Sequence, residues 1–134
     1  MKFYIASSFQ NIKQVRELAE LLMGKGWKHT YDWTDNLKAE SYAHLAEIGK
    51  KEMNAVSESD LLIVILPAGK GSHIEMGIAL ALEKSIYLFS TCKSAYNFDQ
   101  TSTFYHVDGV NRYVGDLNSF SQYILMENLK NSSI

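Results

Sequence analysis

Residues 57–82 read SESDLLIVILPAGKGSHIEMGIALAL, and this stretch decides the fold class. Positions 61–66 are all aliphatic, which is typical of a strand buried on both faces of a sheet. Helical spacing is expected over 72–84, where Glu75 is the last charged residue before Glu83. A buried strand that leads directly into an apolar helix is characteristic of α/β proteins.

The rest of the chain repeats this alternation. The pattern predicts strands at 2–6, 27–33, 60–67 and 85–90, and helices at 11–26, 38–56, 72–84 and 117–130. A loop is expected at 92–103, and one or two short strands at 104–114. We therefore predict a flavodoxin-like three-layer α/β sandwich on a parallel sheet of four or five strands in the order 2-1-3-4-5, with residues 1–134 as one domain.

Composition excludes several classes of function. A net charge of −2 gives no electrostatic basis for binding polymeric nucleic acid or an anionic membrane. The one cysteine, Cys92, rules out an intramolecular disulfide and fits a reducing compartment. No apolar run has the length of a membrane span or the form of a signal peptide, so a cytoplasmic location is expected. Four scattered histidines predict no metal site and no metal cofactor.

The predicted topology places two loops side by side. In the 2-1-3-4-5 order, ligands bind at the carboxyl ends of strands 1 and 3, where the winding reverses direction. The loops that leave these strands are ASSFQN (6–11) and LPAGKGSH (66–73). The glycines Gly69 and Gly71 lack the spacing of a Walker motif. They are interpreted either as an anion or hydroxyl cradle at a helix N-terminus or as a simple turn.

Glu75 has two interpretations. With Ser72 it fits a capping box, in which Ser72 is the N-cap and Glu75 the third helical residue. Alternatively, the helix N-terminus keeps Glu75 ionised in a partly desolvated crevice. Such a carboxylate is suited to attack on an electron-poor carbon such as a sugar C1.

Further polar residues are expected near the crevice. Tyr4 lies in strand 1, where it either places its hydroxyl at the floor of the crevice or is an ordinary core tyrosine. Ser7 and Ser8 end that strand, either to bind hydroxyls and phosphate or to cap the next helix. Asp60 opens the buried strand as a solvated residue or as a second carboxylate of the site.

The segment TYDWT (30–34) follows strand 2. Its aromatic residues flank Asp32. One interpretation is a base-binding site, in which Trp33 stacks on a planar base and Asp32 accepts hydrogen bonds from that base. The alternative for this segment is a satellite hydrophobic cluster.

The segments FYIASSF, TYDWT, SESDLLIVILPAGKGSHIEMGIALAL and IYLFS resemble the nucleoside 2-deoxyribosyltransferase-like superfamily. This group includes nucleoside 2-deoxyribosyltransferases and deoxyribonucleoside 5′-monophosphate N-glycosidases. The resemblance covers roughly residues 1–90 and implies a flavodoxin-like fold, a homodimer with residues lent across the interface, and a small nucleoside or nucleotide as substrate.

The resemblance also implies roles for individual residues. Glu75 would be the nucleophile that forms a glycosyl-enzyme, Tyr4 would orient it, and Asp60 would hold or protonate the departing base. Ser7, Ser8 and the backbone around Gly69, Gly71 and Ser72 would surround the sugar and its 5′ end. The loop SSFQN lacks the arginine found at this place in the monophosphate glycosidases, so the reaction type is better supported than the subgroup.

Two classes of function follow. The first is an enzyme that cleaves the N-glycosidic bond of a nucleoside or its 5′-monophosphate and passes the sugar to water or to another base. The second is a non-catalytic nucleotide-binding or sensing module that uses the same crevice. A homodimer or larger assembly is expected in addition, because the helix MGIALAL (76–82) is apolar nearly all round and one sheet covers one of its faces.

Overall fold

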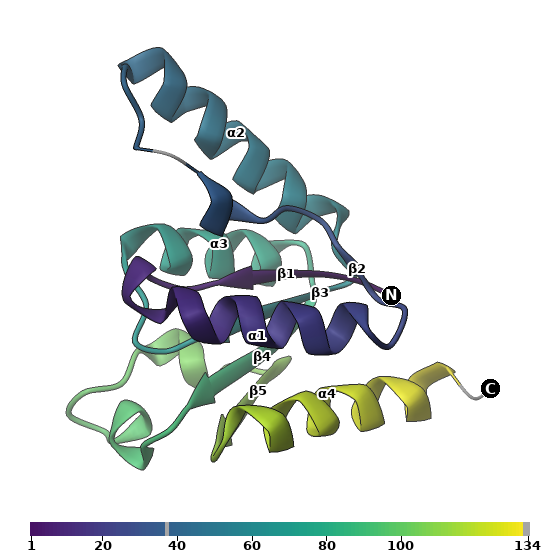
Figure 1. Ribbon diagram of the computed structural model, residues 1–134. Coiled ribbons are helices and arrows are strands. Elements are labelled where there is room, and N and C mark those ends of the chain that lie inside the picture. The colour runs from purple at the N-terminus through teal and green to yellow at the C-terminus, as the bar shows by residue number, and fades with distance from the viewer. Residues whose placement is uncertain (37, 133–134) are drawn as a thin grey trace.

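The computed structural model describes residues 1–36 and 38–132 and shows a parallel sheet between two layers of helices (Figure 1). The strands are β1 (Lys2–Ala6), β2 (Lys28–His29), β3 (Leu61–Ile65), β4 (Ser85–Ser90) and β5 (Val110–Val114). They lie in the order β2-β1-β3-β4-β5, and each neighbouring pair is parallel. The flavodoxin-like order and the three-layer α/β class are confirmed.

Four α-helices cover the sheet. They are α1 (Ile12–Met23), α2 (Tyr42–Glu58), α3 (Lys70–Ala81) and α4 (Leu117–Ser132). The pair α1 and α4 packs together on one face, and the pair α2 and α3 on the other. Within the described residues, no helix has the length and apolar character needed to cross a membrane.

The helix faces follow the apolar spacing of the sequence. In α1 the buried residues are Val15, Leu18, Ala19 and Leu22, which form one stripe along the helix. In α2, by contrast, only Ala55 and Val56 are buried, close to its C-terminal end. Figure 1 shows that the N-terminal half of α2 extends beyond the other elements. This half of α2 therefore has little of the protein packed against it.

Several predicted elements have other bounds in the structure; the helix predicted at 38–56, for example, spans Tyr42–Glu58. The second strand is shorter than expected, because after His29 the chain turns into the 3₁₀ helix η2 (Trp33–Asp35), where Asp32 accepts a hydrogen bond from the Thr34 backbone N–H. The helix predicted from Ser72 begins earlier, at Lys70, with Gly69 as its N-cap.

The central strands position the functional site. All residues of β3 are buried, and β1 is buried from Phe3 to Ala6. In the register of the two strands, Ala6 pairs with Val64, so β1 and β3 end side by side. The loops after these strands therefore meet at one edge of the sheet, as the topology predicts.

Candidate active site

A cavity of about 680 Å³ opens where β1 and β3 end. Its walls come from β1 and the loop after it, from residues around η2, from one face of α2 and from the start of α3. Eight of the ten residues predicted for the site line this cavity: Tyr4, Ser7, Ser8, Trp33, Gly69, Gly71, Ser72 and Glu75.

The floor of the cavity holds Tyr4 and Glu75. The Tyr4 hydroxyl donates a hydrogen bond of 2.5 Å to Glu75 Oε2. Tyr4 is fully buried and Glu75 is 6% exposed, so this bond forms largely away from water. A short bond from a hydroxyl to a carboxylate oxygen in such a place fixes the orientation of the carboxyl group.

This geometry rules out the capping-box interpretation. Gly69 is the N-cap of α3, Ser72 lies inside the helix, and the Glu75 carboxylate accepts from Tyr4. The helix dipole acts most strongly on groups in the first turn. Glu75 is the sixth residue of α3 and lies beyond that turn.

The charge state of Glu75 also differs from the prediction. Burial is the main influence and raises the pKa of Glu75 to about 8; the Tyr4 hydrogen bond opposes this rise, and nearby Glu52 adds to it. The expectation that the helix N-terminus keeps Glu75 ionised was wrong, because desolvation of the carboxylate raises its pKa. Burial, Glu75 and Glu52 raise the pKa of Tyr4 in turn, so its hydroxyl stays protonated and remains a donor.

Glu52, in α2, is a site residue that the sequence reasoning missed. Its Oε2 lies 3.4 Å from the Tyr4 hydroxyl, and its side chain lines the cavity. The sequence held a signal for Glu52, because it shares a helix face with Leu45 and Ile48 at spacings of three and four residues. In the structure all three side chains line the cavity. Two carboxyl groups therefore meet at one tyrosine hydroxyl.

Hydrogen bonds tie together the two loops at the cavity edge. Ser7 Oγ donates to the Ile65 carbonyl at 2.8 Å, and Ser8 Oγ donates to the Pro67 carbonyl at 3.3 Å. The Asn11 amide donates to Ser7 Oγ at 2.9 Å and to the same Pro67 carbonyl at 2.8 Å. Asn11 is buried, so these bonds fix the position of the loop after β3 relative to the loop after β1.

Trp33 forms a wall of the cavity. Its Nε1–H donates to the Ile5 carbonyl at 2.7 Å, which fixes the indole ring against β1. Phe9 packs edge-on against this ring with centroids 5.3 Å apart, and it also lines the cavity. The two rings form an aromatic surface of the kind on which a planar base stacks.

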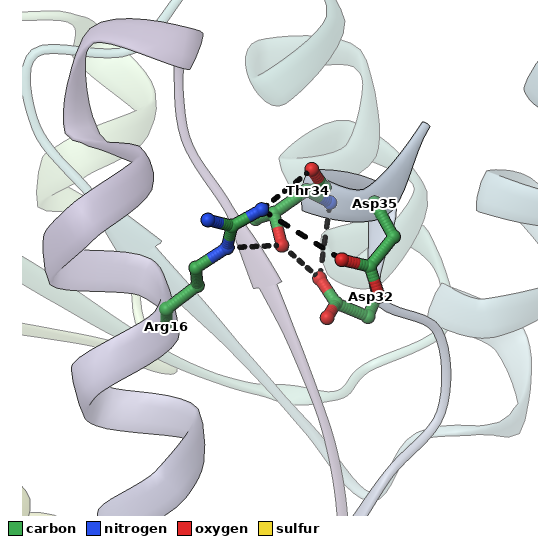
Figure 2. A network of polar contacts seen from close by, with 4 residues as sticks. All are labelled: Arg16, Asp32, Thr34 and Asp35. Carbon is green, nitrogen blue, oxygen red and sulfur yellow. Dashed lines mark hydrogen bonds and ion pairs between the residues drawn. The ribbon is translucent and has the colours of Figure 1, made fainter. Parts of the chain in front are cut away.

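Asp32 does not line the cavity, in contrast to the prediction. Asp32 Oδ1 accepts hydrogen bonds from the Thr34 hydroxyl at 2.5 Å and from its backbone N–H at 3.0 Å (Figure 2). Partial burial of Asp32 works in the opposite direction, but these bonds from Thr34 hold its pKa below the usual value. Asp32 therefore shapes the turn that presents Trp33.

Arg16 attaches this turn to α1. Its guanidinium donates to Thr34 Oγ1 and to the Thr34 carbonyl, both at 3.1 Å, and one nitrogen lies 3.7 Å from Asp35 Oδ1 (Figure 2). Thr34 is buried although both ends of the Arg16–Asp35 ion pair are exposed. The hydrogen bonds to Thr34 consequently contribute more to the position of η2 than the ion pair does.

Asp60 lies at the other edge of the sheet. It precedes β3 at the amino end of the strand, and its Oδ2 accepts a hydrogen bond of 2.7 Å from the Lys2 backbone N–H. The cavity is at the carboxyl end of β3, roughly 16 Å away for a strand of this length. The placement of Asp60 in the crevice was therefore wrong, because the carboxyl ends of parallel strands all face the same edge.

Other parts of the described chain offer less chemistry. A second cavity of about 670 Å³ lies between α4 and the segment that joins α1 to β2, and no carboxylate is among the described residues that line it. Across residues 1–36 and 38–132, no three His, Cys, Asp or Glu side chains are grouped so that they could hold a metal ion.

Comparisons with solved structures agree with this fold. Among solved structures, the chain is similar to the CMP N-glycosidase BcmB of Clostridium botulinum, with 24% identity, a TM-score of 0.68, and coverage of 95% of this chain and 99% of that one. It is also similar to a 2-deoxyribosyltransferase of Bacillus psychrosaccharolyticus, with 21% identity, a TM-score of 0.70 and coverage of 92% of each chain. At these identities the likeness establishes the shared fold.

The sequence has no match among curated proteins. It does match the family described as nucleoside 2-deoxyribosyltransferase over residues 3–122, which is most of its length. The chain is therefore an enzyme, and it belongs to the nucleoside 2-deoxyribosyltransferase family.

Proposed function

We propose that this enzyme cleaves the N-glycosidic bond of a (deoxy)nucleoside or its 5′-monophosphate through a covalent glycosyl-enzyme on Glu75, and transfers the sugar to another base or to water. The observation that carries the proposal is the buried Glu75 carboxyl, held by the Tyr4 hydroxyl and close to a second carboxyl on Glu52. Two nearby carboxyl groups are the arrangement used by enzymes that cleave glycosidic bonds with retention of configuration.

The first step requires one ionised and one protonated carboxyl. Burial raises the pKa of Glu75 to about 8, so the Glu75 carboxyl holds a proton near neutral pH, and transfer of that proton to the neighbouring Glu52 frees Glu75 to attack. With that proton on Glu52, the Glu75 carboxylate attacks C1′ from the side opposite the base. The C1′–N bond breaks, its electron pair leaves with the base, and Glu52 supplies the proton that neutralises the base nitrogen.

The second step releases the sugar. Water or a second base attacks C1′ and transfers a proton to the Glu52 carboxylate, while the bond from C1′ to Glu75 breaks and returns its electron pair to the carboxylate. Tyr4 donates to Glu75 oxygen throughout and limits the cost of its negative charge in a buried place.

The remaining cavity residues have binding roles in this proposal. Trp33 and Phe9 stack on the base. Ser7, Ser8 and the backbone at Gly69 and Gly71 surround the sugar and its 5′ end. The free backbone N–H groups in the first turn of α3 suit either a 5′-hydroxyl or a phosphate there.

The proposal includes a cytoplasmic homodimer or larger assembly built from one-domain chains. Exposed apolar side chains on α2, on α3 and at the C-cap of α3 support association: Tyr42, Leu45, Met53, Ile74 and Leu82. Two neighbouring helices with large exposed apolar residues are typical of a surface that another chain covers.

The test is base release from a panel of nucleosides and their 5′-monophosphates, followed by chromatography with and without a second base. Release that Glu75→Gln reduces by several orders of magnitude, with an unchanged melting temperature, is the expected result. Glu58→Gln, on the exposed C-terminal end of α2, is the matched control and should retain full activity. Binding of nucleosides without any base release would instead identify a sensing module and refute the proposal.

A further inference from the structure

Ser72 differs from the other buried serines of this protein. Within the described residues, the hydroxyls of Ser59, Ser90 and Ser121 each donate to a backbone carbonyl, at 2.7, 2.8 and 2.6 Å. Ser72 is only 4% exposed, yet among the described residues its hydroxyl has no hydrogen-bond partner, and the hydroxyl oxygen is not one of the fully enclosed atoms. A hydroxyl in a mostly buried side chain that is not used by the protein's own backbone is free to bind a ligand in the space that it faces.

The Ser72 hydroxyl opens on the active-site cavity. Ser72 lines that cavity, and the one fully enclosed side-chain nitrogen or oxygen without a partner in the described chain is His29 Nε2. The Ser72 oxygen therefore remains accessible, and the space it faces is the space that holds the substrate. At neighbouring Gly71, a Cβ would meet no protein atom within 4 Å, which leaves room for a sugar ring beside this hydroxyl.

Ser72 lies next to the proposed nucleophile. It precedes Glu75 by three residues in α3, so both side chains lie on one face of the helix. Long side chains on a helix lean toward its N-terminus, which carries the Glu75 carboxyl toward the turn that holds Ser72. A sugar carbon attacked by Glu75 is consequently within reach of a group bound to Ser72.

The chemistry of a nucleoside identifies that group. Glu75 must approach C1′ from the face opposite the base, and in a ribonucleoside this face carries the 2′-hydroxyl on the adjacent carbon. We propose that Ser72 binds this 2′-hydroxyl and that the preferred substrate is a ribonucleoside or its 5′-monophosphate. The inference rests on the proposed function, in that Glu75 sets the position of C1′.

A 2′-deoxy substrate leaves the Ser72 hydroxyl buried and unpaired, and sites built to bind a substrate hydroxyl discriminate against analogues that lack it. The wild-type enzyme should therefore prefer the ribo form over the 2′-deoxy form of the same base. Loss of one such neutral hydrogen bond corresponds to roughly a tenfold change in kcat/KM.

The experiment compares Ser72→Ala with wild type on ribo, 2′-deoxy and 3′-deoxy forms of one nucleoside. We expect kcat/KM for the ribo and 3′-deoxy forms to fall about tenfold and that for the 2′-deoxy form to stay unchanged. Ser72→Cys nearly keeps the side-chain volume but replaces the hydroxyl. It should show the same loss for the ribo and 3′-deoxy forms as Ser72→Ala, which excludes a change in helix stability as the cause of that loss. Ser121→Ala removes a buried helix serine outside the cavity and should alter none of the ratios.

An unchanged ratio of ribo to 2′-deoxy activity would overturn the inference. So would a loss confined to substrates that carry a 3′-hydroxyl, because Ser72 would then bind the other oxygen of that face.

Binding measurements separate this inference from the proposed function. In a Glu75→Gln background, calorimetry should show tighter binding of the ribo form, and adding Ser72→Ala should remove that preference. If wild type releases no base but this binding preference is found, the inference stands and the proposed function fails. If the wild type releases base but Ser72→Ala changes neither kcat/KM nor binding, the proposed function stands and the inference about Ser72 fails. If the wild type neither releases base nor binds nucleosides, the proposed function and the inference are both refuted.

Discussion

The Tyr4 hydroxyl lies 2.5 Å from Glu75 Oε2 although 71 positions separate the two residues in the sequence. The parallel pairing of β1 with β3 creates this contact, because α3 follows β3 and starts beside the end of β1. Tyr4 is thereby a rigid part of the sheet, and Glu75 is held by a donor that cannot move away.

Tyr4→Phe tests what this contact does to Glu75, the proposed nucleophile. The Tyr4 hydrogen bond lowers the pKa of Glu75 against the effect of burial. Its removal should raise that pKa further, so the acid limb of the pH profile of kcat/KM should move to higher pH. A lower rate with the acid limb in its original place would contradict this role. The pH profile of base release provides the measurement.

Glu52→Gln should identify the proton donor for the base. We expect a severe loss, of about 10²-fold or more, on nucleosides with ordinary bases and a much smaller loss on a nitrophenyl riboside, whose leaving group needs no proton. Asp60→Asn is the matched control, since Asp60 lies at the opposite edge of the sheet and should affect neither substrate. Equal losses on both substrates for Glu52→Gln would mean that Glu52 orients Tyr4 or the sugar instead.

His29 makes folding stability depend on pH. Its ring stacks on Phe3 with centroids 4.7 Å apart, and burial lowers its pKa although nearby Asp32 opposes the shift. Below about pH 6.5 the unfolded chain binds a proton at this imidazole that the folded chain does not, so stability is lost as pH falls from there toward the folded pKa. Urea unfolding at pH 7.5 and pH 5.5 should show a smaller acid-induced loss for His29→Phe than for wild type. Identical losses in the two proteins would exclude His29 as the cause.

Ile74→Asp tests the association surface. Ile74 is 65% exposed on α3 and does not line the active-site cavity. A charge buried in an interface without a partner is strongly unfavourable, so this variant should sediment as a 15.2 kDa monomer while wild type sediments as a larger species. Met23→Asp, at an exposed apolar position on α1 in the other layer, should leave the assembly intact. A monomeric wild type at micromolar concentration would rule out the assembly.

The sequence by itself determined the fold and most of the cavity wall. The aliphatic run of β3 and the helical spacing after it are local patterns, and local patterns specify element type and burial. Strand–helix alternation then fixes the switch point, so Tyr4, Ser7, Gly69 and Glu75 were placed together without any long-range information.

The tertiary structure alone decided which carboxyl groups line the cavity. Asp60, Asp32 and Glu52 all follow or precede apolar residues in the sequence, and their spacing does not say which edge of the sheet each one reaches. Packing brings α2 beside α3, which places Glu52 in the cavity, whereas a parallel strand holds Asp60 at its far end and a local turn uses Asp32 as a cap. The raised pKa of Glu75 was likewise decided by the tertiary structure. Desolvation of a carboxyl depends on the atoms that surround it in space and not on its neighbours along the chain.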